Sequence, residues 1–207
     1  MRTRSFCILL VPVLLALEVS SAESRTCQVS QIEGADVRYE ASGQWNALTT
    51  TDLPDGATQI ATGADTRVRI VCDDRIVVTI GPATELALHS LAGPSGSTVD
   101  IVLELASGIV GILAPERTWR LFEVRTPLAI ASVRSTQWLT EHGETETAVF
   151  VRRGSVAVST VNGAANLVEG AGVTVEARAG TVTLGDVKQW SAARIGRSTG
   201  ALGFDWQ

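Results

Sequence analysis

Short alternating runs of β-branched residues are the feature that most restricts how this chain folds. They lie between clusters of Gly, Pro, Asn and Asp, and they cover residues 68–71, 76–80, 85–88, 99–105, 147–151 and 156–159. Strands of this length, at intervals of about 8 to 12 residues, are typical of β-sandwiches, rolls and solenoid-like windings. The sequence therefore predicts an all-β fold with many short strands, in a single domain over residues 28–184.

A loose G-x-V-x-V pattern recurs inside this region. It occurs at Gly108-Ile109-Val110, at Gly154-Ser155-Val156-Ala157-Val158 and at Gly172-Val173-Thr174-Val175. Repeated units would indicate stacked coils, each burying the apolar face of its neighbour. The spacing is unequal, so the pattern leaves both a sandwich or roll and a solenoid-like winding open.

The first 22 residues have the composition of an export signal. Arg2 and Arg4 precede an apolar stretch from Phe6 to Leu17, and small residues end at Ala22. The apolar stretch is shorter than the roughly 17 to 25 residues that span a bilayer, so we expect cleavage after Ala22 and no stable membrane span. No small-residue lipobox precedes Cys27. The sequence therefore predicts that the mature chain is exported.

Charge limits the classes of partner. Removing two Arg and one Glu with residues 1–22 takes the 17 basic and 22 acidic residues to 15 and 21, a net charge of about −6. Nucleic acid and anionic membrane surfaces attract basic proteins, so neither is an expected partner.

Two cysteines remain after cleavage, Cys27 and Cys72. Disulfides persist in oxidising compartments, and a bridge here would close a loop of about 45 residues, which the chain-entropy model credits with roughly 4 kcal/mol. We expect a disulfide, with two buried free thiols as the alternative.

The composition changes after Leu184. Gly185 and Asp186 form a helix-start signal with Asp186 as the N-cap, and Trp190 lies on the apolar side of the expected helix. We expect a short helix that docks on the β-body, followed by a flexible tail over Arg197–Gln207 whose aromatics, Phe204 and Trp206, find a local pocket. Residues 185–207 thus form the last predicted segment.

The segment Phe122–Trp138 reads FEVRTPLAIASVRSTQW, and TAVFVRRGSVAV follows it at 147–158. An F-x-V-x-T-P segment, then V-R-x-T, an aromatic residue and a V-x-x-G-x-V-x-V strand together resemble the FecR domain family. The likeness extends over residues 29–184. The residues that carry it as a structural motif are Thr126, Pro127, Arg134, Thr136 and Trp138.

The resemblance implies a role in the cell envelope. Better-known members of the family are transmembrane regulators that restrain a sigma factor in the cytoplasm and receive a signal in the periplasm. We expect this chain to correspond to the periplasmic sensing portion, without direct sigma-factor control. The expected partner is an envelope protein or glycan of unknown identity, and the sequence does not specify an oligomeric state.

Two positions depart from the family pattern. Ser135 stands where V-R-G-T is common, so a positive φ there would be strained. Asp73-Asp74-Arg75 replaces the usual D-G-S turn. These changes leave the fold assignment in place but do not support a detailed surface role for the two loops.

No residue pattern predicts catalysis, and we expect no cofactor and no metal. His89 reads as a solvent-facing strand residue, and His142 lies in Glu141-His142-Gly143-Glu144, which reads as a solvated hairpin turn. The Gly93–Thr98 stretch lacks the lysine and the strand-to-helix context of a phosphate loop. A structural role in an envelope assembly is the alternative function, and hydrolysis of envelope glycans is a weaker one.

Arg134 is the residue with the clearest expected physical role. Its guanidinium could bind a carboxylate bidentately and pin a turn next to Thr136, with Arg125 as an exposed counterpart. We expect Arg134→Ala to lower the melting temperature without changing partner capture per folded molecule.

Overall fold

A computed structural model of the chain describes residues 24–54, 56–72, 75–91, 93–94, 100–115, 119–204 and 206. For Ser24, Gly93, Pro94, Arg134 and Ser135 it describes the backbone alone. The predicted signal peptide, residues 1–22, lies outside the described residues, as do the turn residues Asp73 and Asp74 and the glycine-rich stretch 95–99.

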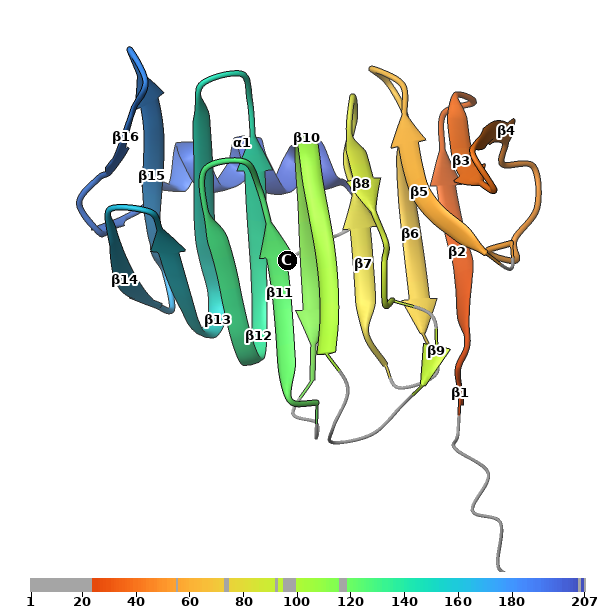
Figure 1. Cartoon of the computed structure of the whole chain (residues 1–207), viewed down its shortest axis with the longest axis horizontal. Coiled ribbons are helices and arrows are strands. Elements are labelled where there is room, and N and C mark those ends of the chain that lie inside the picture. Colours follow the sequence, from red (N-terminus) through yellow and green to blue (C-terminus); the bar gives the residue numbers. More distant parts are fainter. Residues whose placement is uncertain are drawn as a thin grey trace, which may run out of the picture.

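One sheet of 15 strands winds into two facing layers (Figure 1). The front layer contains β4 (Gln44–Ala47), β3 (Val37–Ala41), β5 (Ala57–Thr62), β8 (Glu85–Ala87), β11 (Leu121–Arg125) and β14 (Gly163–Val168). The back layer contains β2 (Cys27–Glu33), β6 (Arg67–Cys72), β7 (Val77–Ile80), β15 (Ala171–Arg178), β16 (Thr181–Leu184) and β17 (Lys188–Gln189). A separate pair joins β1 (Ser24–Arg25) to β9 (Gly93–Pro94). The all-β prediction is confirmed.

Three long strands belong to both layers: β10 (Asp100–Ala114), β12 (Ile130–His142) and β13 (Glu146–Thr160). In β10 and β13, one half pairs with front-layer strands and the other half with back-layer strands. The front half of β12 pairs with β11, and its back half lies between the back halves of β10 and β13. The runs 147–151 and 156–159, which the sequence suggested as separate strands, are therefore the two halves of β13. Neighbouring strands are antiparallel except β10 and β11, which are parallel.

The crossings between layers explain two of the repeated glycines. Gly108 in β10 and Gly154 in β13 have positive φ values of 91° and 89°. A Cβ on Gly108 would lie 2.2 Å from the Thr84 hydroxyl. That hydroxyl accepts a hydrogen bond from the Ile109 N–H at 3.0 Å. Glycine is required at this bend because a side chain has neither the conformation nor the space.

The main core lies between the two layers. It is formed by the inward-facing positions of the strands, for example Ile60 and Leu103 in front and Ile70 and Val149 behind, all fully buried. Period-2 alternation places every second side chain on this inner face, which is the pattern that the sequence shows.

A second apolar cluster covers the outer face of the back layer. It joins the sheet to helix α1 (Ala192–Leu202), which lies behind the strands in Figure 1, and comprises Ile109, Leu139, Ala148, Phe150, Trp190, Leu202 and Trp206. Two glycines of the sheet make room for it. A Cβ on Gly111 would lie 2.5 Å from the Trp206 indole nitrogen, and one on Gly172 would lie 2.1 Å from that of Trp190.

The helix begins later than the sequence predicted. Ser191 is the N-cap, and its hydroxyl accepts a hydrogen bond from the Arg194 N–H at 3.3 Å, so Asp186 is not the cap. Residues 188–189 are extended because they pair with β15, and the Trp190 N–H continues this pairing by donating to the Gly170 carbonyl. Sheet pairing over a long sequence distance overrides the local helix signal.

The expected flexible tail is also different. Residues 197–202 belong to α1, and Phe204 and Trp206 are buried. Arginines of β6 hold this end: Arg67 donates to the Ala201 carbonyl at 2.6 Å and Arg69 to the Phe204 carbonyl at 3.4 Å. Cations at a helix C-terminus satisfy its free carbonyls and complement its dipole.

Candidate functional site

The segment Phe122–Trp138 connects the two layers. Phe122 in the front layer and Trp138 in the back half of β12 are fully buried, with ring centroids 5.4 Å apart in an edge-to-face arrangement. Trp119 packs on Phe122 in the same way at 5.8 Å. Such pairs add about 0.5–1.5 kcal/mol to the burial of the rings. The contact between Phe122 and Trp138 thus joins the front and back layers through the core.

Thr126 and Pro127 lie in the turn between β11 and β12. The Thr126 hydroxyl accepts hydrogen bonds from the N–H groups of Leu128 and Ala129 at 3.2 and 3.0 Å. The Thr126 N–H donates to the Ala129 carbonyl at 2.8 Å. The two residues reverse the chain, and a hydroxyl that bonds the backbone of its own turn is the mechanism.

Thr136 lies where β12 passes from one layer to the other. Its hydroxyl donates to the Ser155 carbonyl at 2.9 Å, and the register shifts between Val133 and Thr136. Arg134 and Ser135 are the residues within this shift. The Arg134 side chain lies outside the described part of the chain, so its bidentate carboxylate contact remains a prediction.

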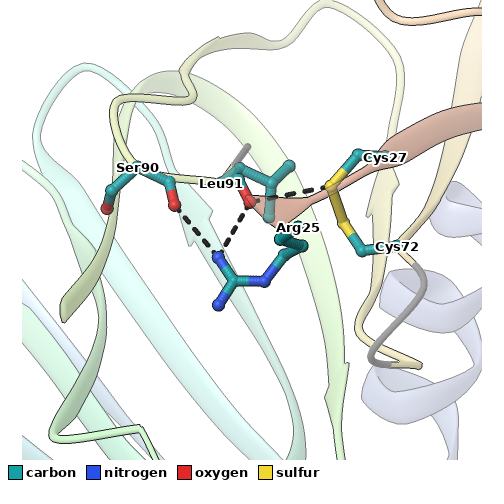
Figure 2. The surroundings of a disulfide bond; sticks show 5 residues. All are labelled: Arg25, Cys27, Cys72, Ser90 and Leu91. Atoms are coloured by element: carbon teal, nitrogen blue, oxygen red, sulfur yellow. Dashed lines mark hydrogen bonds between the residues drawn. A yellow bond between two sulfur atoms is a disulfide. The ribbon is translucent and has the colours of Figure 1, made fainter. Parts of the chain in front are cut away.

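Cys27 and Cys72 face each other on neighbouring strands β2 and β6, and the structure joins them in a disulfide (Figure 2). Arg25 is buried nearby and donates to the carbonyls of Leu91 at 2.9 Å and Ser90 at 3.2 Å. The Cys27 sulfur lies 3.6 Å from the Leu91 oxygen. A bonded sulfur has no proton to donate, so we count that distance as a contact only. This corner anchors the first strands.

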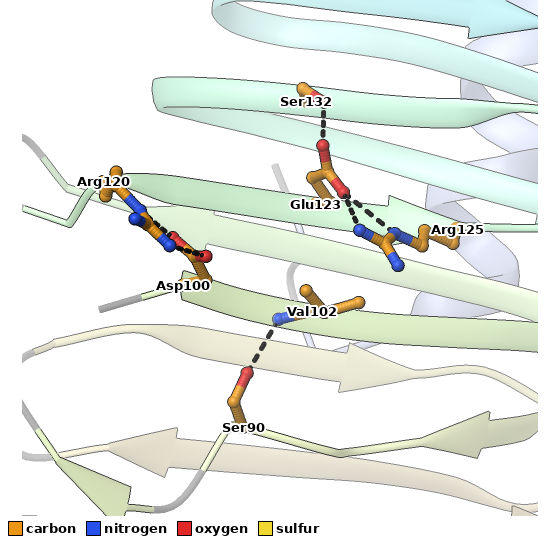
Figure 3. Close-up of polar contacts among 7 residues, drawn as sticks. All are labelled: Ser90, Asp100, Val102, Arg120, Glu123, Arg125 and Ser132. Atoms are coloured by element: carbon orange, nitrogen blue, oxygen red, sulfur yellow. Dashed lines mark hydrogen bonds and ion pairs between the residues drawn. The ribbon is translucent and has the colours of Figure 1, made fainter. Parts of the chain in front are cut away.

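Ion pairs lie on the outer face of the front layer (Figure 3). Glu123 accepts from Arg125 Nε at 2.9 Å and from the Ser132 hydroxyl at 2.9 Å. Arg120 Nε donates to Asp100 at 2.8 Å, and hydrogen bonding to this guanidinium lowers the pKa of Asp100. The carboxylates of Glu123 and Asp100 are thus each paired with an arginine of the same layer.

The two histidines have different surroundings. His89 lies in a turn after β8, with its side chain half exposed and 3.3 Å from Glu104. His142 is only 8% exposed, so the prediction that its turn is solvated is wrong for this residue. Its Nδ1 lies 2.8 Å from the Thr147 hydroxyl, which lies 2.9 Å from the Thr126 hydroxyl. Burial lowers the pKa of His142 because it disfavours the charged imidazolium.

No group of three or more metal-ligating side chains converges within the described ranges. Three hollows in the described surface lie beside α1. One groove, here called the α1 groove, has two sections of about 580 and 480 Å³ that share Thr174, Glu176 and Arg194. The Arg194 guanidinium stacks on the Trp190 ring at 3.9 Å and donates to the Thr174 hydroxyl at 3.2 Å.

The walls of the α1 groove carry charges of both signs. Its side chains include Glu141, Glu146, Glu176, Asp186, Lys188, Arg194 and Arg197. A third hollow, here called the basic hollow, has a volume of about 420 Å³. It is lined by Gln137, Phe150, Arg152, Arg153, Glu169, Gly170 and Ile195. Gln137, Phe150, Arg152 and Arg153 belong to the motif segments 122–138 and 147–158, but the sequence did not predict that they line a hollow.

Residues 58–157 match the family model described as FecR protein. The chain contains a FecR domain. The matched residues run from β5 into the front half of β13 and include the whole Phe122–Trp138 segment, so the resemblance is confirmed there. The FecR match ends before β14, and α1 lies beyond it.

Two solved structures share the fold of this FecR-domain chain. Both are crystal structures of a candidate anti-sigma factor from Parabacteroides distasonis, each with a TM-score of 0.55 and 18% sequence identity. The similarity covers 67% of this chain and 62% of the other. No curated protein matches the chain significantly. In the part of the FecR-domain chain that the structure describes, no helix has the length and apolarity needed to cross a bilayer.

Proposed function

We propose that this chain is an exported, non-enzymatic sensing module of the FecR type that binds a protein of the cell envelope in the periplasm. The FecR match over residues 58–157 is the observation that carries the proposal. The export signal expected at residues 1–22 supports the location.

The α1 groove is the proposed contact surface. Open hollows with charges of both signs suit polar protein surfaces, where complementary charges set specificity and association rate. The groove rests on a rigid base, because Trp190 stacks on Phe150 at 4.8 Å and both are buried. A preformed base lowers the ordering cost of binding.

Site-specific photocrosslinking in intact cells tests this proposal. A crosslinking residue is placed at Glu176 in the α1 groove, and a matched one at Ala157 on the outer face of the front layer. We expect a discrete protein adduct from position 176 and none from position 157. Self-crosslinks alone, or equal adducts from both positions, would contradict the proposal and favour a structural role in an assembly.

Location is tested separately with an alkaline phosphatase fusion at the C-terminus, since this enzyme requires an oxidising compartment to become active. We expect activity from the full chain and its loss when residues 2–22 are deleted. Activity that survives the deletion would contradict export by this segment.

A further inference from the structure

The basic hollow is built around an irregularity in strand pairing. Gln137 pairs with Arg153 and Trp138 with Val151, so Arg152 is an extra residue on β13. A β-bulge of this kind disturbs strict alternation and redirects side chains. As a result, the consecutive residues Arg152 and Arg153 both line the same hollow, which a regular strand would prevent by pointing them to opposite faces.

Neither guanidinium contacts an acceptor in the part of the chain that the structure describes. Eight other arginines pair with carboxylates or donate to oxygens, namely Arg25, Arg38, Arg67, Arg69, Arg120, Arg125, Arg178 and Arg194. The guanidinium groups of Arg75 and Arg197 have no such contact among the described residues either, but these two residues are not adjacent to another arginine. Within the described residues, Arg152 and Arg153 have no hydrogen bond or ion pair. Glu169 lines the same hollow without pairing with either of them.

Arg152 and Arg153 carry like charges side by side, and Glu169 is the one carboxylate among the residues that line the hollow, so two positive charges face one negative charge. Charges interact more strongly next to apolar surface, where the effective dielectric constant is low. Phe150 and Ile195 supply that surface in the basic hollow, and Phe150 is 1% exposed. Gln137 adds an amide from the neighbouring strand. Planar donors beside an apolar base form the arrangement that recognises carboxylate and phosphate oxygens bidentately.

We propose that Arg152, Arg153 and Gln137 form a binding site for an oxyanion, a carboxylate or phosphate group. The overall charge of the chain is −5, so the site is a local positive spot on an acidic protein. Anions are attracted there by the two guanidinium groups and not by the protein as a whole. This site is independent of the α1 groove contact, because a small anion alone occupies it.

The test is a titration in which NMR of the arginine Nε–H groups monitors binding. Full-length processed protein is titrated with inorganic phosphate, and in a second arm with acetate, against sodium chloride at constant ionic strength. We expect saturable shifts at Arg152 and Arg153 with at least one of the two anions. Saturation with phosphate alone or acetate alone identifies which group the site takes.

Variants make the result decisive. Arg153→Gln, at an exposed position, should weaken binding about tenfold, as expected for a charge-assisted hydrogen bond. R152Q/R153Q should abolish saturation, and R178Q, which removes an exposed arginine paired with Glu176, should leave it unchanged. Linear shifts of equal size at Arg75 and Arg178, no shift with either anion, or saturation that survives R152Q/R153Q would overturn the proposal. None of these outcomes depends on the envelope partner.

Discussion

The two halves of β13 have different surroundings. In the back half, residues 147–151 are all buried, because the core covers one face and α1 with its flanking residues covers the other. In the front half, residues 155–159 alternate between exposed and buried, because the outer face of the front layer has no such cover among the described residues. The sequence reflects this difference: TAVFV has apolar residues at every position after its threonine, whereas SVAVS has the small residues Ser, Ala and Ser at its exposed positions and valine at its buried ones. A change from continuous to alternating character within one strand therefore indicates where a second layer of cover ends.

Removal of the Phe150 ring, in the back half of β13 that α1 covers, should give the largest loss of stability. Phe150→Ala deletes the side chain that stacks on Trp190, and large-to-small changes of this kind cost about 3–5 kcal/mol. The matched change in the front half is Ser159→Ala, which should alter stability by less than about 0.5 kcal/mol. Urea unfolding measures both. Equal free-energy losses would show that α1 adds nothing to the back half.

The disulfide lies in the back layer alone, between β2 and β6. The double variant Cys27→Ser/Cys72→Ser should lose up to about 4 kcal/mol by release of loop-closure entropy. Hydrogen exchange should accelerate in β2 and β6 more than in front-layer β5 and β8. If both thiols of the untreated, denatured wild-type protein react with an alkylating reagent, the bridge is absent in the purified protein.

Substitution of two glycines tests the same comparison with a smaller expected loss of stability. Gly172→Ala places a Cβ 2.1 Å from the Trp190 indole, and forced overpacking costs about 1–3 kcal/mol. Gly163→Ala, in β14 of the front layer, meets only Leu184 at 3.7 Å and should be near neutral. Thermal unfolding and Trp190 fluorescence should both change for the first variant alone. An unchanged G172A protein would mean that the helix is not packed as closely as the structure has it.

The smallest expected effect is a pH dependence of stability that comes from His142. The pKa of His142 is lowered in the folded state, so below the ordinary value of 6.5 the unfolded chain binds more protons than the folded one. Stability should fall as pH decreases through and below that value, and it should be insensitive to this group above it. His142→Gln should flatten the dependence over this range. Identical profiles for wild type and H142Q would contradict the assignment.

Much of the fold was predictable because local patterns specify it. Alternation located most strand segments, and the Thr126-Pro127 turn follows from the chemistry of its own residues. The start of α1 was not predictable from local signals. Residues 188–189 are held extended by pairing with residues 171–172 of β15, which lie outside the short stretch of sequence that a helix signal includes. Propensity over a short window cannot include that partner.

The basic hollow was not predictable from the sequence motif either. Arg152 and Arg153 lie between the two predicted strand runs 147–151 and 156–159, and on a regular strand they would point apart. Only the register of β13 against β12 shows the extra residue that brings them together. The one available sequence signal was two adjacent arginines followed by Gly154 inside an otherwise continuous strand.

The anchoring of the helix by Arg67 has a kinetic consequence. The Arg67–Ala201 hydrogen bond joins residues 134 positions apart, so it forms only after nearly the whole chain is present and the strands between them have paired. Contacts of such separation slow folding. Until α1 closes, Leu139, Phe150 and their neighbours form an open apolar strip, and such strips favour aggregation in partly folded chains. Removal of α1 would leave the apolar strip of this cluster exposed to water.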